Sequence, residues 1–252
     1  MPQIVFITGA TAGFGKACAE KFASYGYDLI INGRREDRLL EIKTTLENKF
    51  NTAVITSCFD VRNREAVFTA IRNLPQDWQQ IDVLINNAGL ALGRDFFDEG
   101  NLDDWDTMID TNLKGLIYVT KAALPLLKKS SHPHIINMGS VAGKEVYEKG
   151  NVYCASKAAV DSLSQSMRID LLRQQIKVTA IHPGAAETEF SIVRFKGDEA
   201  TAKKIYDGLK PLTAEDVADV VYYCTTLPAH VCINDLTLSC TQQANAIYFN
   251  RK

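Results

Sequence analysis

The sequence lacks the patterns that mark several classes of protein. Its six cysteines include no Cys-x-x-Cys pair and no zinc-ligand spacing, and its four histidines form no ligand cluster with them. We therefore expect reduced thiols and no metal site. No window approaches about 18 uninterrupted apolar residues, and the chain opens on a short apolar run rather than a cleavable leader. These absences predict a cytoplasmic protein with no membrane partner.

The charged residues argue against a further class of partner. Lysine and arginine number 28 against 30 aspartate and glutamate, the net charge is -2, and no basic stripe occurs. This distribution argues against a nucleic-acid surface. The sequence holds no repeat, no low-complexity tract and no interdomain linker, and its 252 residues are 46% hydrophobic. We therefore expect a single domain over residues 1–252 with one large core.

Short apolar runs alternate with longer stretches of helical periodicity along the chain. The runs are too short for helices and indicate buried strands. Their alternation with helices predicts an α/β fold, a doubly wound parallel sheet of about seven strands with helices on both faces. Such sheets bind ligands at the carboxyl ends of their strands. The expected strands span residues 3–8, 28–32, 53–58, 81–85, 134–139, 176–182 and 233–239, and the expected helices 14–25, 35–49, 62–72, 102–130, 151–172 and 214–225.

A glycine-rich turn follows the first expected strand. Gly9 allows a tight bend, and Gly13 and Gly15 allow close approach of the backbone where helix 14–25 begins. A pyrophosphate binds readily at such a helix N-terminus. A glycine cluster alone can be an ordinary turn, but the strand before it and the helix after it favour a dinucleotide site.

Two arginines, Arg34 and Arg35, follow the second expected strand, where an NAD site usually carries an acid. Arginine suits a bidentate contact with phosphate. The pair therefore predicts binding of NADP(H) through its 2′-phosphate. The alternative is that both arginines only begin a charged surface helix.

The sequence contains three Tyr-x-x-x-Lys pairs, at Tyr153/Lys157, Tyr206/Lys210 and Tyr248/Lys252. If residue 151 onward is helical, Tyr153 and Lys157 leave the same face. A neighbouring ammonium favours the phenolate of a tyrosine, which makes the pair a candidate general base. Ser140, at the end of an expected strand, then supplies a hydroxyl to polarise a carbonyl. The other two pairs lack a nucleotide-binding context and serve as internal controls.

Several spaced motifs give the chain a specific resemblance. They are Thr8-Gly-Ala-Thr-Ala-Gly-Phe-Gly15, Asn86-Asn-Ala-Gly89, Asn112, Ser140, Tyr153 with Lys157, and Pro183-Gly184. Over nearly its whole length the chain resembles the short-chain dehydrogenase/reductase family. The resemblance implies a Rossmann fold, an alcohol dehydrogenase or carbonyl reductase, and a homotetramer.

The same resemblance implies the roles of individual residues. Tyr153 is the acid/base, Lys157 lowers the pKa of Tyr153 and binds the nicotinamide ribose, and Ser140 hydrogen-bonds the substrate oxygen. Asn112 supports a proton relay at a local helix break. Besides the glycines and arginines named above, the implied cofactor-binding residues are Thr11, Phe14, Asp60, Val61, Asn87, Ala88, Gly89, Tyr153, Lys157, Pro183, Gly184, Ala186 and Thr188.

Two of these residues have structural alternatives. Asp60 can equally be the N-cap of a helix over residues 62–72. Asn112 is a poor helix former within an expected helix, and it can be a buried, hydrogen-bonded structural residue instead of part of a relay.

The segments 183–198 and 227–234 resemble the 3-hydroxy acid (serine/allo-threonine) dehydrogenase branch of the family. The resemblance implies NADP-dependent oxidation of the 3-hydroxyl of L-allo-threonine, L-serine or 3-hydroxyisobutyrate. A carboxylate bound in a partly dry pocket requires a paired cation. Arg194, within an expected substrate lid over residues 189–208, is the candidate. The alternatives are a solvated Arg194, with Arg94 or Lys144 as the cation.

Two other functions use many of the same features. One is a general NADPH-dependent carbonyl or ketoacyl reductase, and the other is a catalytically silent NADPH-binding sensor. The charge of segment 189–208 argues against large apolar substrates. Intact Ser140, Tyr153 and Lys157 argue against a silent protein, because a scaffold has no need of an ionisable triad.

Overall fold

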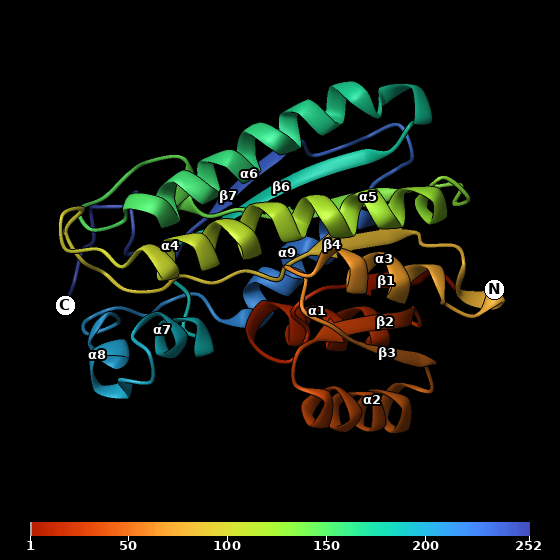
Figure 1. Cartoon of the computed structure of the whole chain (residues 1–252), viewed down its shortest axis with the longest axis horizontal. Helices are drawn as coiled ribbons and strands as arrows, with labels where there is room; N and C mark the ends of the chain where they lie inside the picture. The colour runs from red at the N-terminus through yellow and green to blue at the C-terminus, as the bar shows by residue number, and fades with distance from the viewer. Residues whose placement is uncertain (1) are drawn as a thin grey trace.

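The computed structural model describes residues 2–252 and contains a seven-stranded parallel sheet in the order β3-β2-β1-β4-β5-β6-β7 (Figure 1). The strands are β1 Ile4–Ile7, β2 Asp28–Gly33, β3 Val54–Cys58, β4 Val83–Asn86, β5 His134–Met138, β6 Lys177–Pro183 and β7 Asp235–Leu238. The α-helices are α1 Gly13–Ser24, α2 Glu36–Phe50, α3 Arg64–Arg72, α4 Leu102–Ile109, α5 Leu116–Leu127, α6 Asn151–Asp170, α7 Glu189–Arg194, α8 Glu199–Lys204 and α9 Ala214–Thr225. The α/β Rossmann fold predicted from the sequence is confirmed.

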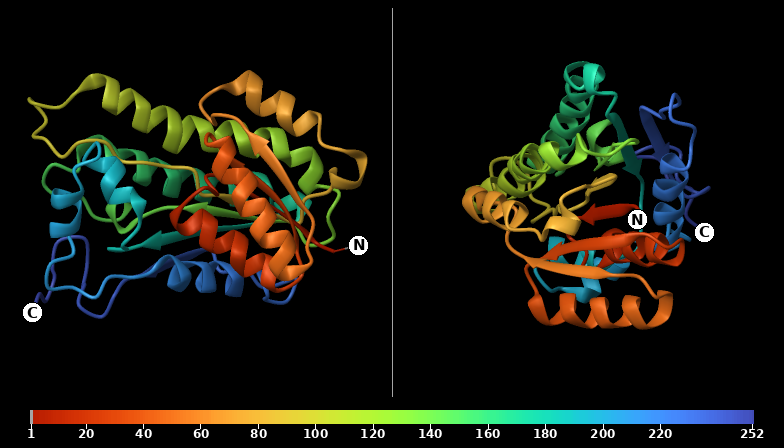
Figure 2. Two further views of the ribbon diagram at one scale, coloured as in Figure 1. Left: turned by 90° about the horizontal axis from the view of Figure 1, so that it is seen from below. Right: turned by 90° about the vertical axis from the view of Figure 1, so that its right-hand side faces the viewer.

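The helices cover both faces of the sheet (Figure 2). Side chains alternate along a strand, so Val5 and Ile7 of β1 face the core under α1, α2 and α9. Ile4 and Phe6 of the same strand face the core under α3 and α5. Because both faces are covered, parallel strands such as β1 are apolar throughout.

Strand β1 is the point where the strand order reverses. It pairs with β2 on one side and β4 on the other, so the chain crosses over β1 between β3 and β4. The loops after neighbouring strands then diverge and leave a crevice at the carboxyl end of the sheet. The glycine turn and the Asn86-Asn87-Ala88-Gly89 segment both lie at this crevice.

Two regions depart from the expected elements. The single helix expected over residues 102–130 is interrupted by a π-helical segment, η2 Asp110–Gly115, between α4 and α5. The expected lid over residues 189–208 contains the two short helices α7 and α8. The C-terminal residues pack against the end of this lid, because Lys252 N donates to Gly208 O and Arg251 Nη1 donates to Asp207 O. Among residues 2–252, no helix is both long and apolar enough to cross a membrane.

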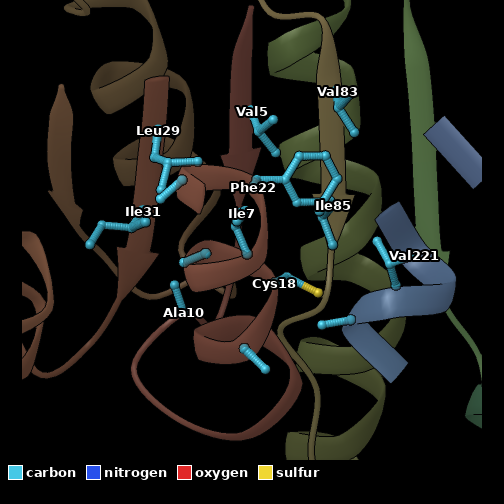
Figure 3. Packing of buried hydrophobic residues seen from close by; sticks show 14 of the residues in the cluster. Val5, Ile7, Ala10, Cys18, Phe22, Leu29, Ile31, Val83, Ile85 and Val221 are labelled. Carbon is cyan, nitrogen blue, oxygen red and sulfur yellow. The ribbon is translucent and has the colours of Figure 1, made fainter. Parts of the chain in front are cut away.

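The ring of Phe22 fills the centre of the core between α1 and the sheet. It is fully buried and lies over Val5, Ile7 and Ile85 (Figure 3). The ring also makes an edge contact with Tyr27 at a centroid distance of 5.1 Å. Packing at this position therefore joins β1, β4 and α1.

We expect Phe22→Ala to lower the free energy of unfolding by about 3–5 kcal/mol, because it leaves a cavity in a close-packed core. Phe97→Ala is the matched control, since Phe97 is 72% exposed and its loss should cost less than about 1 kcal/mol. Denaturant titration of both variants measures the difference. Equal losses in the two variants would contradict the packing role assigned to Phe22.

Candidate active site

A cavity of about 910 Å³ lies at the carboxyl ends of the strands. Of the residues expected to bind cofactor or substrate or to catalyse, all line this cavity except Gly15 and Asn112. The motifs predicted that distant parts of the chain would meet here. The cavity brings together the glycine turn, the β2 arginines, Ser140, Tyr153, Lys157 and the 183–188 segment. The structure thus gathers residues from one end of the chain to the other around a single cavity.

The glycine turn fits a phosphate group at the start of α1. Gly9 and Gly13 have φ angles of 65° and 51°, which favour glycine because a side chain would be strained. No side chain caps the N-terminus of α1 and no acid lies in its first turn, so its N–H groups suit an anion. A Cβ at Gly15 would lie 2.3 Å from Gly9 O, so Gly15 allows the close backbone approach expected of it where α1 packs against the turn. Gly15 does not itself line the cavity.

The amides of Asn86, the last residue of β4, and of Asn87 just after it bond mainly within the protein. Asn87 Nδ2 donates to Thr8 O at 2.9 Å and to Gly9 O at 3.1 Å, which holds the glycine turn against the end of β4. Asn86 Nδ2 donates to Thr120 Oγ1 and Asn137 Oδ1. Residues 87–89 line the cavity, and the bonds of the two amide side chains hold this segment in place.

The arginines after β2 lie at one end of the cavity, and a third joins them. Arg34 lines the cavity, and Arg35 Nη2 donates to Thr11 Oγ1 at 3.0 Å. Arg35 and Arg38 both form ion pairs with Glu189, at 3.1 Å and 2.7 Å. Arg34 and Arg35 therefore do more than begin a surface helix.

Asp60 also lines the cavity, but it is not the helix cap that the sequence allowed. Asn63 Oδ1 accepts from Ala66 N and is the N-cap of α3. Asp60 instead pairs with Arg62 at 2.6 Å. Partial burial would raise the pKa of Asp60, but the hydrogen bonds from Arg62 outweigh it and lower that pKa.

Tyr153 and Ser140 lie together at the inner part of the cavity. Tyr153 is on the first turn of α6, and Ser140 is the N-cap of the short 3₁₀ turn η3 Val141–Gly143. Burial raises the pKa of Tyr153 well above its usual value, and nearby Tyr147 raises it further. The Ser140 hydroxyl and the charge of Arg194 act in the opposite direction. The phenol is therefore protonated at neutral pH and available as a proton donor.

Lys157 Nζ donates to Met138 O at 2.8 Å. Of the nearby cations, Arg194 lowers the pKa of the Tyr153 phenol, and the same effect of Lys157 stays a prediction. Burial lowers the pKa of Lys157 itself to about 8. Its amine can therefore gain or lose a proton near neutral pH.

Asn112 lies in the π-helical segment η2, as a helix break at this position requires. Its Oδ1 accepts from Leu90 N at 2.8 Å, and its Nδ2 donates to Leu90 O at 2.9 Å and to Ser156 Oγ at 3.0 Å. These bonds tie η2 to the loop after β4 and to α6. The side chain thus makes the contacts of a structural residue, and the proton relay stays a prediction.

Arg194 reaches the same inner region from α7. It is only 8% exposed, its Nη1 donates to Tyr147 Oη at 3.0 Å, and its guanidinium carbon lies 5.5 Å from the Tyr153 ring centroid. Arg94 also lines the cavity, with its guanidinium carbon 5.8 Å from the Tyr147 ring. Lys144 does not line the cavity and pairs with Asp161 and Asp235 instead. Two of the three candidate cations are therefore available to an anion beside Tyr153.

Sequence reasoning missed four residues that shape the site. Tyr147 supports Arg194, Arg38 and Glu189 belong to the arginine cluster, and Gln243 holds the 183–186 segment by accepting from Ala185 N at 2.7 Å. Only Arg38 had a local signal, since it lies one helical turn beyond Arg34. The control tyrosines differ in placement: Tyr206 lines the cavity and donates to Ala186 O at 2.7 Å, whereas Tyr248 is 71% exposed.

Comparison with known proteins identifies the family. The family model for short chain dehydrogenase matches residues 3–198, and the chain belongs to this family, as its motifs predicted.

Within the family the chain has close relatives of stated activity. It is 47% identical to the NADP-dependent 3-hydroxy acid dehydrogenase YdfG of Escherichia coli (strain K12) over 245 residues, 97% of each chain. It is 46% identical to sulfoacetaldehyde reductase 2 of Chromohalobacter salexigens, over 97% of this chain and 96% of that protein. The structure superposes with a TM-score of 0.92 on the closed form of serine dehydrogenase complexed with NADP+, at 46% identity over 99% of this chain and 100% of that one.

We expect replacement of Arg34 and Arg35 together by alanine to weaken binding of NADP far more than binding of NAD. A hydrogen bond to a charged group is worth roughly 1.5–3 kcal/mol, so the NADP/NAD preference should fall by more than about tenfold. Fluorescence titration with both reduced cofactors measures it. Arg72→Ala, at the exposed end of α3, is the control, and an unchanged preference in the double variant would place the phosphate contact elsewhere.

Proposed function

We propose that the chain is an NADP(H)-dependent oxidoreductase that oxidises the 3-hydroxyl of small hydroxy or amino acids such as L-allo-threonine, L-serine or 3-hydroxyisobutyrate. The observation that carries this proposal is the position of Arg194, buried beside Tyr153 with Arg94 lining the same cavity. A cation at this depth suits a substrate whose carboxylate lies close to the carbon that reacts. The names of the 3-hydroxy acid dehydrogenase and serine dehydrogenase relatives support the same substrate class.

The cofactor assignment has independent support from the chain itself. Arg34 and Arg35 stand where an acid would select NAD, and both line the cavity. The α1 N-terminus and glycine turn fit a pyrophosphate. NADP(H) would supply the hydride acceptor or donor, and the protein supplies orientation and proton transfer.

Tyr153, Ser140 and Lys157 each have a different role in proton transfer. In the reducing direction, Tyr153 donates its proton to the carbonyl oxygen, which Ser140 holds by a hydrogen bond. In the oxidising direction, Tyr153 must accept the alcohol proton, and the positive charge of Arg194 favours the phenolate that can do so. Lys157, with a pKa near 8, then exchanges a proton with Tyr153 during turnover. Asn112 keeps the loop after β4 and α6 in place around this pair.

A second candidate function is reduction of sulfoacetaldehyde. Its sulfonate is separated from the reacting carbon by one carbon, as is the carboxylate of a 3-hydroxy acid, so Arg194 and Arg94 suit either anion. The 46% identical sulfoacetaldehyde reductase 2 supports this candidate. A general carbonyl or ketoacyl reductase has no need of the buried Arg194, and a silent sensor has no need of Tyr153 and Lys157. Assembly as a homotetramer and a cytoplasmic location stay predictions from the family resemblance.

We expect Tyr153→Phe to abolish turnover with little change in NADPH binding, because it removes the proton donor and leaves the cofactor cavity in place. Loss of one acid/base group typically costs about 10²–10⁴-fold in rate. Steady-state assays at 340 nm with fluorescence titration of NADPH test both statements. Tyr248→Phe is the control on the exposed Tyr-x-x-x-Lys pair, and wild-type turnover in Tyr153→Phe would exclude Tyr153 as the acid/base.

We expect Arg194→Ala to raise KM for the hydroxy acid about 10- to 100-fold, since one charged hydrogen bond is lost, and Arg194→Lys to raise it less. Each acid is compared with its methyl ester, which lacks the carboxylate charge and whose KM should change little. Equal turnover of acid and ester by the wild-type enzyme would show that no carboxylate contact exists. If Arg94→Ala instead carries the larger effect on the acid alone, the carboxylate lies at Arg94.

A further inference from the structure

Glu189, the first residue of α7, holds two arginines at the cofactor end of the cavity. Its Oε1 accepts a hydrogen bond from Arg38 Nη1 at 2.7 Å, and its Oε2 accepts one from Arg35 Nη1 at 3.1 Å. Partial burial would raise the pKa of Glu189, but the hydrogen bonds from Arg38 and Arg35 outweigh it and lower that pKa. The carboxyl is therefore ionised at neutral pH and places a fixed negative charge between the two guanidinium groups.

Arg35 bonds the Glu189 carboxylate and also lines the cavity. Its Nη2 donates to Thr11 Oγ1 at 3.0 Å, which holds the guanidinium against the glycine turn. Glu189 lines both the main cavity and a second cavity of about 490 Å³, which Arg38 and Thr11 also line. Within residues 2–252, Arg34 has no ion pair of its own. An anion bound between Arg34 and Arg35 therefore contacts one guanidinium without an ion pair among the described residues, that of Arg34, and one that is already paired with a carboxylate, that of Arg35 with Glu189.

We propose that Glu189 tunes the preference for the phosphorylated cofactor by sharing Arg35 with the 2′-phosphate of NADP(H). This inference rests on the proposed use of NADP(H). The carboxylate and the phosphate carry like charges and repel each other across Arg35, so Glu189 lowers the affinity for NADP(H) below the value that the arginines alone would give. Glu189 also has a structural effect, because its hydrogen bond with Arg38 connects α7 to α2.

These two effects of Glu189 can be separated by comparing two cofactors. Loss of the bond between α7 and α2 changes the enclosure of any dinucleotide, so it alters the binding of NADPH and NADH alike. The repulsion acts only on the cofactor that carries the 2′-phosphate. The ratio of the two dissociation constants therefore isolates the coupling between Glu189 and the phosphate, as in a double-mutant cycle.

The test is fluorescence titration of NADPH and NADH against the wild-type protein, Glu189→Gln and Glu187→Gln. The change to Gln keeps the size of the side chain and removes its charge. We expect the Kd ratio of NADH to NADPH to rise about fivefold in Glu189→Gln, the upper end of the range for one partly exposed charge pair. Glu187→Gln removes the same charge two residues earlier, at an exposed position without an ion pair in the described chain. Its ratio should stay within about twofold of wild type.

Each outcome of the titrations either supports or overturns the role proposed for Glu189. A ratio that is unchanged or lower in Glu189→Gln overturns the inference while leaving the NADP(H) assignment intact, because Glu189 would then not oppose the phosphate. Wild-type protein that binds NADPH no more tightly than NADH overturns the cofactor assignment and the inference with it. Glu189→Ser is a second uncharged variant, at the first position of a helix that Thr188 caps, and it should change the ratio in the same direction if poor folding of Glu189→Gln obscures the result.

Discussion

In the 3₁₀ turn η3, which follows β5, the chain passes so close to α6 that no side chain fits at Gly143. A Cβ there would lie 2.6 Å from both the carbonyl carbon and the carbonyl oxygen of Lys157. Lys157 Nζ in turn lies 2.8 Å from Met138 O. The separation of helix and strand is therefore fixed at the point where Ser140 and Tyr153 face the cavity. Proton transfer needs donor and acceptor placed within a fraction of an ångström, and this contact supplies that rigidity.

The strands and the motifs at their ends could be predicted because the information is local. A parallel strand covered on both faces is a run of apolar residues, as in β1 and β4, and the glycine turn directly follows such a run. The π-helical break could not be found from periodicity. It coincides with Asn112, whose side chain bonds Leu90, 22 residues earlier, and Ser156, 44 residues later. The family resemblance alone suggested a break there.

The electrostatics of the site were harder to predict than its residues. Tyr153 and Lys157 lie one helical turn apart, as their spacing requires, but this spacing does not say where the ammonium points. It points to Met138 O, while the guanidinium of Arg194 lies over the Tyr153 ring. Burial, which no spacing reveals, raises the pKa of Tyr153 and lowers that of Lys157. Burial therefore moves the two pKa values apart, so the phenol keeps its proton at neutral pH while the amine can lose one.

Helix α7 places one residue at each end of the cavity. Its first residue, Glu189, pairs with the arginines at the cofactor end, and its last residue, Arg194, lies beside Tyr153 at the reacting end. Six residues of helix form a short rigid rod, so the two side chains cannot be positioned independently. Under the proposed function, a substrate carboxylate at Arg194 and the 2′-phosphate at Arg35 would lie at opposite ends of this one helix. Binding of substrate and binding of cofactor should then be coupled through α7, although the two anions do not touch.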